Sequence, residues 1–218
     1  MEAQLKETGN ELKSFTKDKN VYDIEQGDAK FSEKISNYDV SLELLTENKI
    51  EMVRQWRNDP KIQQYMEYRE TITPEMQKKW FDKLNNGKDN FYFILQYKGE
   101  DIGLINVKDI DYEKKTGESG IFIYQDKFLN TDISYRAHLV MFDYFFDNLA
   151  LESLYSHVLQ TNKRAQRFTL FLGGFLADNQ ESVDNQLYII SKDAYKNNKN
   201  RIRFVERYNL MKNKNQNI

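Results

Sequence analysis

The chain has 218 residues, of which 32 are basic and 34 acidic, so its formal net charge is -2. This length favours one domain with extensions, and the balanced charge provides no overall attraction to nucleic acid or to anionic membranes. The absence of cysteine excludes disulfides, thiolate metal sites and a cysteine nucleophile, and the 2 histidines are too few for a histidine-built metal site. We therefore expect neither a metal nor a nucleic-acid partner.

The polarity of the sequence divides it into three parts. Residues 1–38 are polar and are predicted to be an N-terminal extension, residues 39–192 the ordered domain, and residues 193–218 a basic C-terminal helix and tail. The N-terminus has no apolar h-region, and no apolar run approaches the ~18 residues that cross a bilayer. We therefore expect a cytoplasmic protein without a membrane partner.

The first predicted elements of the domain are a strand, two helices and a hairpin. Val40–Leu44 alternates polar and apolar residues as a half-buried strand does. A helix ending at Asp59 follows, and Thr73-Pro74 begins another, because threonine caps a free amide and proline fits the first helical turn. Phe91–Tyr97 and residues 102–107 then predict two antiparallel strands joined by a tight turn.

The second half of the domain alternates strands with helices. Residues 118–124 predict a strand, residues 133–148 an apolar helix, and residues 154–159 another strand, so the helix is suited to a crossover between parallel strands. A further helix is predicted over residues 163–172 and a last strand over residues 186–191. A hairpin followed by a crossover predicts an α/β fold with a mixed sheet.

Four segments match a known family in order and spacing. They are Trp56-Arg57-Asn58, residues 97–105, residues 118–123, and Asn162-Lys163-Arg164-Ala165 with Phe168 and residues 172–175. Together they resemble the GNAT superfamily of N-acetyltransferases over about residues 40–192, and within it the branch that acetylates amino sugars and ribosomal proteins. The resemblance implies a GNAT-like mixed sheet, antiparallel in its first half, with a splayed parallel strand pair and helices on both faces.

The resemblance also implies that acetyl-CoA is the cosubstrate and lies where the two parallel strands splay apart. Its pantetheine arm would pair with strand backbone as an added strand does. Its pyrophosphate would lie at the start of the next helix, where free amides and the helix dipole favour an anion. The residues that the resemblance places around the coenzyme are Ile121, Ile123, Leu129, Asn130, Thr131, Asp132, Ile133, Ser134, Asn162 and Arg164.

The expected pyrophosphate loop departs from the family pattern, which is Arg or Gln, two residues, Gly, one residue, then Gly or Ala. Leu129, Asp132 and Ser134 stand at these positions. On a structural interpretation, Asp132 is an ordinary helix N-cap. Its carboxylate would then lie where the anion binds. Either the loop still offers its amides, or coenzyme affinity is lost. Asn162 has the same two interpretations, coenzyme contact and N-cap.

Acyl transfer from a thioester needs a neutral amine, an oxyanion stabiliser and a proton for the departing thiolate. Glu118 stands where family members place a carboxylate base, and its alternative is a solvated residue at the start of a strand. A backbone amide within residues 121–123 would stabilise the oxyanion. Thr169 occupies the family's tyrosine position and is too weak an acid, so Tyr124, Tyr135, Tyr155 or solvent must protonate the thiolate.

The resemblance implies that the first two helices and their loop form the wall that receives the acceptor. The residues placed there are Arg57, Tyr65, Met66, Trp80 and Phe81. Aromatic and methionine side chains suit the apolar face of a deoxy-sugar, and arginine suits a phosphate or carboxylate. Packing in the core is the alternative for Met66, Trp80 and Phe81. His157, in the middle of a predicted strand, is interpreted as structural.

These features predict an enzyme that moves an acetyl group from acetyl-CoA to a primary amine of a small molecule, with an amino-sugar nucleotide as the favoured acceptor. Two alternatives stay open. One is a protein N-terminal or ribosomal acetyltransferase. The other is a degenerate GNAT-like binding domain without catalysis, which the residues Asp132, Ser134 and Thr169 suggest. The effect of acetyl-CoA on the melting temperature would separate an enzyme from a degenerate domain.

Overall fold

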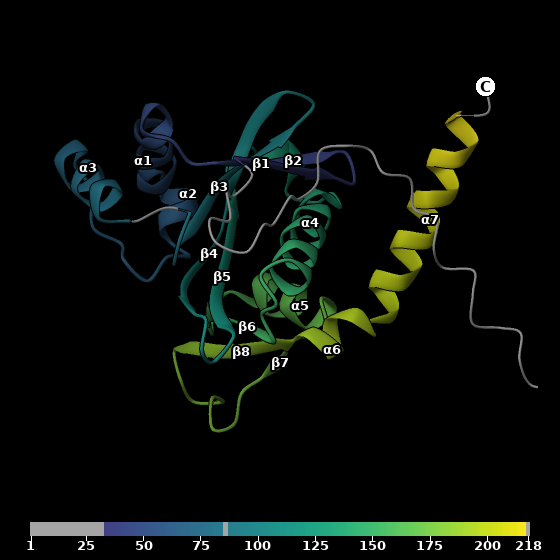
Figure 1. Cartoon of the computed structure of the whole chain (residues 1–218). Helices are drawn as coiled ribbons and strands as arrows, with labels where there is room; N and C mark the ends of the chain where they lie inside the picture. The colour runs from purple at the N-terminus through teal and green to yellow at the C-terminus, as the bar shows by residue number, and fades with distance from the viewer. Residues whose placement is uncertain (1–32, 85–86, 217–218) are drawn as a thin grey trace, which may run out of the picture. The chain divides into compact units, whose positions relative to one another are not determined.

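The computed structural model describes residues 33–84 and 87–216. Within them, an 8-stranded sheet has the order β1-β2-β3-β4-β5-β6-β8-β7 (Figure 1). Its strands are β1 (Lys34–Asn37), β2 (Val40–Leu44), β3 (Phe91–Tyr97), β4 (Glu100–Asp111), β5 (Thr116–Ile123), β6 (Ser153–Leu159), β7 (Phe175–Leu176) and β8 (Asn185–Ser191). The α-helices are α1 (Ile50–Asn58), α2 (Pro60–Gln63), α3 (Pro74–Lys83), α4 (Ile133–Asp147), α5 (Lys163–Phe171), α6 (Lys192–Lys196) and α7 (Lys199–Gln216). Only β5 and β6 pair in parallel, which confirms the predicted mixed sheet with an antiparallel first half.

Tight turns set the register of the antiparallel half. Tyr38 and Asp39, between β1 and β2, have positive φ angles of 52° and 61°, the combination that a two-residue type I′ turn requires. Lys98 and Gly99, with φ angles of 50° and 81°, make the same kind of turn between β3 and β4. The predicted hairpin is therefore confirmed. The predicted start of α3 is confirmed too, because the Thr73 hydroxyl accepts the Met76 amide and Pro74 opens the helix.

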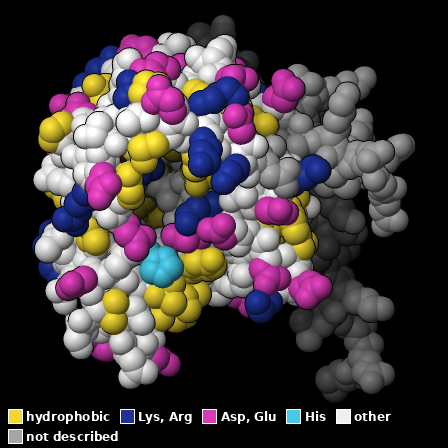
Figure 2. Space-filling view, turned by 90° about the vertical axis from the view of Figure 1, so that its left-hand side faces the viewer, with side chains coloured by type: hydrophobic (Ala, Val, Ile, Leu, Met, Phe, Trp, Pro, Cys, Tyr) yellow, Lys and Arg dark blue, Asp and Glu magenta, His cyan; other side chains and the backbone are white. Residues whose placement is uncertain are grey.

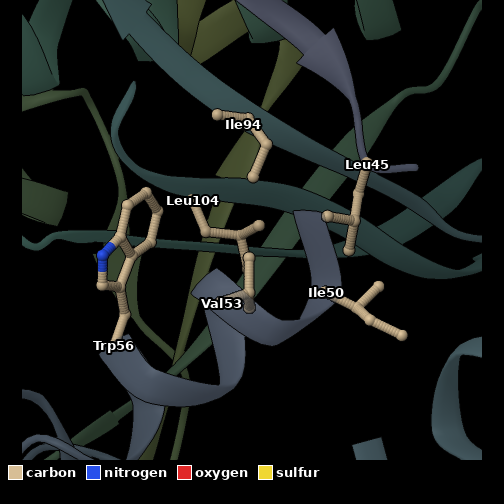
Figure 3. Close-up of a cluster of buried hydrophobic side chains, with 6 residues drawn as sticks. All are labelled: Leu45, Ile50, Val53, Trp56, Ile94 and Leu104. Carbon is tan, nitrogen blue, oxygen red and sulfur yellow. The ribbon is translucent and has the colours of Figure 1, made fainter. Parts of the chain in front are cut away.

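Helices cover both faces of this sheet (Figure 1). Successive strand side chains point to opposite faces, so Ile94 of β3 meets α1 while the ring of Phe91 meets Phe145 of α4 at 5.2 Å. Figure 3 shows the cluster on the α1 side, formed by Leu45, Ile50, Val53, Trp56, Ile94 and Leu104. Each such buried side chain contributes about 1.5–3 kcal/mol to the stability of the fold. The cluster thereby holds α1, which carries Arg57, against this face of the sheet.

The parallel pair of strands is short. Thr116, Gly117 and Glu118 of β5 lie opposite residues 153–155 of β6. Beyond this point β6 stays paired with β8 as far as Leu159, whereas β5 continues to Ile123 with β4 as its partner. The crossover between them is α4, which ends one residue before its predicted end. The two parallel strands therefore splay apart after Glu118.

The C-terminal part has two helices where the sequence analysis expected one. After α6 the chain breaks at Asn198, whose side-chain oxygen accepts the amides of Asn200 and Arg201 and so starts α7. At the other end, β1 lies within the range that was predicted as an extension, and residues 1–32 lie outside the described residues. Among the helices that the structure describes, none is long and apolar enough to cross a membrane.

Candidate active site

The separation of β5 from β6 begins at Ser119. Its hydroxyl lies 3.4 Å from the Tyr155 carbonyl oxygen and 3.4 Å from the Ser156 hydroxyl. Further along, the amide of Tyr124 donates to the carbonyl of Ile102 at 2.8 Å. Because neighbouring residues of a strand direct their backbone groups to opposite sides, the backbone of Ile121 and of Ile123 faces the gap. These are the strand groups that the sequence analysis predicted to be exposed.

Two cavities meet in the gap between the strands. The first, here called the fork cavity, has a volume of about 390 Å³ and reaches from Glu118 and His157 to α5. The second, here called the loop cavity, has a volume of about 530 Å³ and extends along β5 to the start of α4. The residues lining both are Met66, Ile121, Phe122, Asn162, Ala165 and Phe168. A ligand lying across the gap would therefore touch both cavities.

Glu118 is the centre of a charged cluster in the fork cavity. Its carboxylate accepts from Lys108 Nζ at 2.9 Å and lies 3.3 Å from His157 Nδ1. Burial lowers the pKa of Lys108, but hydrogen bonds to Glu118 and Asp109 outweigh it and raise the pKa above its usual range. A carboxylate paired with this ammonium only accepts, so His157 Nδ1 donates to it; in the neutral imidazole the lone pair is then on the other ring nitrogen, Nε2.

This cluster gives His157 a chemical capability that its place in a strand did not indicate. Its side chain is 38% exposed and lines the fork cavity. A neutral imidazole oriented by a carboxylate is able to accept a proton from a bound amine. Lys108 was not singled out from the sequence either; it lies directly opposite Glu118 across β4 and β5, next to a shift in register between Lys108 and Asp111.

Arg57 reaches the fork cavity from α1, and no carboxylate of the described residues forms an ion pair with it. Its Nε atom is buried without a hydrogen-bond partner among the described residues. Burial lowers the pKa of its guanidinium, which Tyr92 only partly offsets, and an arginine nevertheless stays charged. Since an unpaired buried charge is costly, an anionic group entering this cavity would be stabilised by Arg57.

His138 lies at the inner end of the fork cavity and is uncharged at neutral pH. It is 5% exposed, and burial lowers its pKa to about 4, although the nearby Ser134 carbonyl oxygen, 2.8 Å from Nδ1, acts in the opposite direction. The rings of Phe142 and Phe168 stand edge-on to it at 5.3 and 5.0 Å. This histidine is therefore part of the aromatic packing behind the fork.

The loop cavity ends at the start of α4, where most of the predicted pyrophosphate loop lies. The residues of this loop that line the cavity are Leu129, Asn130, Thr131 and Ser134. The side chain of Ile133 is buried in the core instead. The amides of Ser134 and Tyr135 have no acceptor in the described part of the chain. The first turn of α4 thus has two free N–H groups, and Ser134 places one of them at the end of the cavity.

Asp132 does not cap α4 with its side chain. Its carboxylate instead pairs with Arg136 Nη2 at 2.9 Å, and Arg136 also pairs with Asp39 at 3.1 Å. The side chain lines neither of the two cavities. The negative charge that the sequence analysis expected at the anion-binding end is therefore directed away and compensated.

The start of α5 supplies the remaining predicted coenzyme contacts. Asn162 lines both cavities, and its side-chain oxygen accepts the Ala165 amide at 3.1 Å, which confirms its role as an N-cap. Arg164 lines the loop cavity. Thr169 donates to the Ala165 carbonyl oxygen at 3.0 Å and is buried. Its hydroxyl is therefore committed to the helix.

None of the three tyrosines considered as proton donors lines the fork cavity or the loop cavity. Tyr124 stacks on Trp56 with ring centroids 5.3 Å apart. Tyr135 packs between Phe171 and the C-terminal helix, away from the fork. Tyr155 stands edge-on to His157 at 6.0 Å. Solvent is the remaining proton source that the sequence analysis named.

The predicted acceptor wall is only partly brought together. Arg57 and Met66 line the fork cavity, and Met66 and Tyr65 line the loop cavity. Trp80 and Phe81 instead pack against the apolar cluster of α1, because α3 turns its inner stripe to that helix. Trp80 meets the ring of Tyr92 at 5.1 Å, and it is Tyr92 that lines the fork cavity.

The surface over α1, α2 and α3 carries charges of both signs. Figure 2 shows acidic, basic and apolar side chains interleaved around a hollow on this face. The charged residues of the fork cavity follow the same mixture, since Arg57 and Lys108 face Glu67 and Glu118. Within the described residues, no group of three or more histidine, aspartate or glutamate side chains is placed to hold a metal ion.

The sequence and the fold were compared with known proteins. The profile of the acetyltransferase (GNAT) domain family matches residues 39–174. A comparison with curated proteins gives no match. Among solved structures, the fold is similar to spermidine N-acetyltransferase from Vibrio cholerae in complex with CoA and spermine, with 19% identity, a TM-score of 0.65, and coverage of 74% of this chain and 100% of that one. It is also similar to FdhC, described as a nucleotide-linked sugar GNAT, with 22% identity, a TM-score of 0.65, and coverage of 79% and 96%.

Proposed function

The chain belongs to the GNAT acetyltransferase family, and we propose that it transfers an acetyl group from acetyl-CoA to a primary amine of an anionic small molecule. The observation that carries the proposal is the gap between β5 and β6, where free strand backbone, free helix amides and the Glu118–His157 pair lie along two connected cavities. The gap suits an extended thioester on one side and an amine on the other.

The coenzyme would occupy the loop cavity. Its pantetheine arm would pair with the backbone of Ile121 and Ile123, as a strand added to a sheet edge does. Its pyrophosphate would accept the amides of Ser134 and Tyr135 at the start of α4. The free amides at the start of α4 support this placement although the loop lacks glycine, and the carboxylate of Asp132 is turned to Arg136. Bound acetyl-CoA supplies the activated acetyl group.

The chain's own residues would manage the protons in the fork cavity. The amine nitrogen bonds to the acetyl carbon, the carbon–sulfur bond breaks, and the amine gives up one proton. His157 Nε2 would take that proton while Glu118 holds the imidazole through Nδ1 and stabilises the resulting cation. A backbone amide within residues 121–123 would donate to the oxyanion, and solvent would protonate the thiolate.

The acceptor is proposed to be an amino sugar linked to a nucleotide. Arg57, whose Nε has no hydrogen-bond partner among the described residues, favours a phosphate or a carboxylate, while Tyr92 and Met66 offer apolar surface for a sugar ring. A polyamine such as the spermine bound by the Vibrio cholerae enzyme would offer no anionic group to Arg57. The similarity to FdhC supports the same choice.

The test is an acetylation assay with acetyl-CoA and two acceptor classes, nucleotide-linked amino sugars and polyamines. We expect free thiol and an acetylated product, identified by its mass, with the sugar nucleotides only. Arg57→Gln should raise the KM for the sugar nucleotide about tenfold, since a charge-assisted hydrogen bond is lost. Arg167→Gln, which removes the same charge from an exposed position on α5 outside both cavities, is the matched control. Turnover of polyamines alone would contradict the proposal for the acceptor.

A binding domain without catalysis is the second candidate. It is favoured by the absence of a tyrosine at Thr169 and of the family's glycines at Asp132 and Ser134. A melting temperature that acetyl-CoA leaves unchanged, with no thiol released in the presence of any acceptor tested, would support this candidate. Failure of acetyl-CoA to bind at all would contradict the enzyme proposal.

A further inference from the structure

A third cavity, of about 520 Å³, lies beside the start of α4 and is closed on its far side by α7. We call it the tail groove and define it by Thr131, Tyr135, Phe171, Arg203, Phe204 and Arg207. Its α7 residues recur at helical spacing, so a single face of α7 lines it. Helix α7 lies beyond the residues that the family profile covers, and Figure 1 shows it on the α4 side of the sheet.

The charges in the tail groove are unbalanced. Asp132 is its acidic residue, and this carboxylate is already paired with Arg136. Arg203 and Arg207 are exposed, and neither has a carboxylate within ion-pair distance in residues 33–84 and 87–216. By contrast, Arg201 and Lys212 on the same helix are each paired with an aspartate. The groove therefore presents two uncompensated guanidinium groups to a ligand.

The groove also offers apolar surface next to these cations. The ring of Tyr135 is held between Phe171 and Phe204, with centroid distances of 5.1 and 5.3 Å. Phe171 is 46% exposed, although it lines the cavity. An exposed aromatic ring beside arginine suits a flat, partly polar ring system that bears an anionic group.

The tail groove is continuous with the loop cavity. Thr131 and Phe168 line both. A ligand that begins in the gap between β5 and β6 and passes the free amides of α4 would reach the tail groove with its distal end. A molecule of coenzyme A has an adenine ring and a 3′-phosphate at that end, beyond the pyrophosphate.

Resting on the proposed use of acetyl-CoA, we propose that the tail groove binds the adenosine 3′-phosphate end of the coenzyme, with Arg203 and Arg207 on the phosphate and Phe171 against the adenine. The C-terminal helix thus contributes cations to a coenzyme site whose usual loop lacks glycine. Guanidinium groups are suited to phosphate because they donate in a planar, paired geometry.

The test compares the affinities of the full chain for CoA and for dephospho-CoA, which lacks only the 3′-phosphate, by calorimetry. Wild-type protein should bind CoA about tenfold or more tightly than dephospho-CoA, because charge-assisted bonds to the phosphate are made only by CoA. The double variant Arg203→Gln/Arg207→Gln should bind both ligands with the affinity that the wild type has for dephospho-CoA. Lys214→Gln, a charge removal further along α7 and outside the groove, should retain the full difference.

A second variant tests the contact with the adenine ring independently of the contact with the phosphate. Phe171→Ala should weaken CoA and dephospho-CoA by the same factor, about five- to tenfold, because the adenine is common to both. Since these side chains are exposed, an unchanged melting temperature without ligand would show that each variant is folded.

Three outcomes would overturn the proposal. Wild-type protein that binds the two ligands equally would show that the phosphate is not recognised. A double variant that keeps the difference would assign the recognition to other residues, with the proposed acetyl transfer unaffected. A double variant that changes only the oligomeric state, seen by sedimentation, would make the groove an interface between copies. Binding of neither ligand by the wild type would overturn the proposed function as well.

Discussion

Two clusters of charged side chains differ in how completely their charges are paired. Under α6 and α7, Asp143 of α4 accepts from Tyr195, Lys196 and Arg201 at 2.8–3.1 Å. In the fork cavity, Glu118 has partners but Arg57 has none among the described residues. Both clusters hold a partly buried arginine, and only one of the two arginines is neutralised by a carboxylate.

This difference distinguishes charges that stabilise the fold from charges that are available to a ligand. A paired carboxylate such as Asp143 links α4 to α6 and α7, and its partners compensate its charge. An unpaired guanidinium costs stability and is retained only where something else compensates it. The same contrast is found along α7, where Arg201 is paired with Asp143, whereas Arg203 and Arg207 have no ion pair within the part of the chain that the structure describes. Variants in the two clusters should therefore have opposite signatures.

The largest effect is expected at Glu118. Glu118→Gln should lower kcat by about 100-fold or more, because His157 loses the carboxylate that orients it and stabilises its cation. Affinity for acetyl-CoA, measured by calorimetry, should stay within about twofold. His157→Gln should lower kcat similarly, and the double variant should be little worse than either, since the pair acts as a unit. Unaltered kcat at saturating substrate would assign Glu118 to the solvated strand-start alternative.

The next effect is expected at Asp143 and concerns stability. Asp143→Ala should lower the free energy of unfolding by about 3 kcal/mol in denaturant titration, because Lys196, Arg201 and Tyr195 lose a shared, partly buried partner. The kcat should be retained below the new melting temperature. Asp147→Ala, one turn further along α4, is the matched control: it removes an exposed ion pair to Lys196 and should cost about 0.5 kcal/mol or less. Equal losses in the two variants would contradict the distinction between the clusters.

An intermediate effect is expected from His138 at acidic pH. Its pKa is lowered to about 4 in the folded protein by burial, whereas an unfolded histidine titrates near 6.5. Between these values the unfolded chain binds a proton that the folded protein does not, so stability falls as the pH decreases through this window. The loss should be about 2 kcal/mol at pH 5 relative to pH 8.

His138→Phe, which suits the surrounding aromatic rings, should remove this part of the acid sensitivity in denaturant titrations at the two pH values. The control is His157→Phe, because His157 is partly exposed and its replacement should leave the acid sensitivity from His138 in place. An identical pH dependence in wild type and His138→Phe would contradict the buried neutral state.

The smallest effect is expected at Asp132. Its carboxylate stands near the proposed pyrophosphate site but is compensated by Arg136. Asp132→Asn should tighten acetyl-CoA binding a few-fold, since a like charge near phosphate costs on the order of 1 kcal/mol in a solvated site, and the gain should shrink with added salt. Asp178→Asn, the same charge change at an exposed site outside the cavities, should have no effect. Weaker binding by Asp132→Asn would mean that Asp132 holds Arg136 in a useful position.

Local sequence patterns were sufficient to predict most elements and several site positions. Strand alternation predicted β2, the aromatic-rich run before a turn predicted β3, the threonine cap and proline predicted the start of α3, and the motif around Glu118 and Asn162 predicted which segments form the fork. These features depend on backbone periodicity and on capping, which act over a few residues. The family resemblance, confirmed over residues 39–174, supplied the order of the pieces.

The partners of the charged side chains, by contrast, follow from the folded arrangement of the strands and helices. Lys108, Glu118 and His157 come from three strands, and their meeting depends on strand order and register. The same holds for Arg57, whose Nε has no hydrogen-bond partner among the described residues. It also holds for Trp80, because the inner stripe of α3 packs on α1 instead of lining the cavity. Partnership between charges depends on contacts that are distant in sequence, and short-range patterns do not encode which residues those contacts bring together.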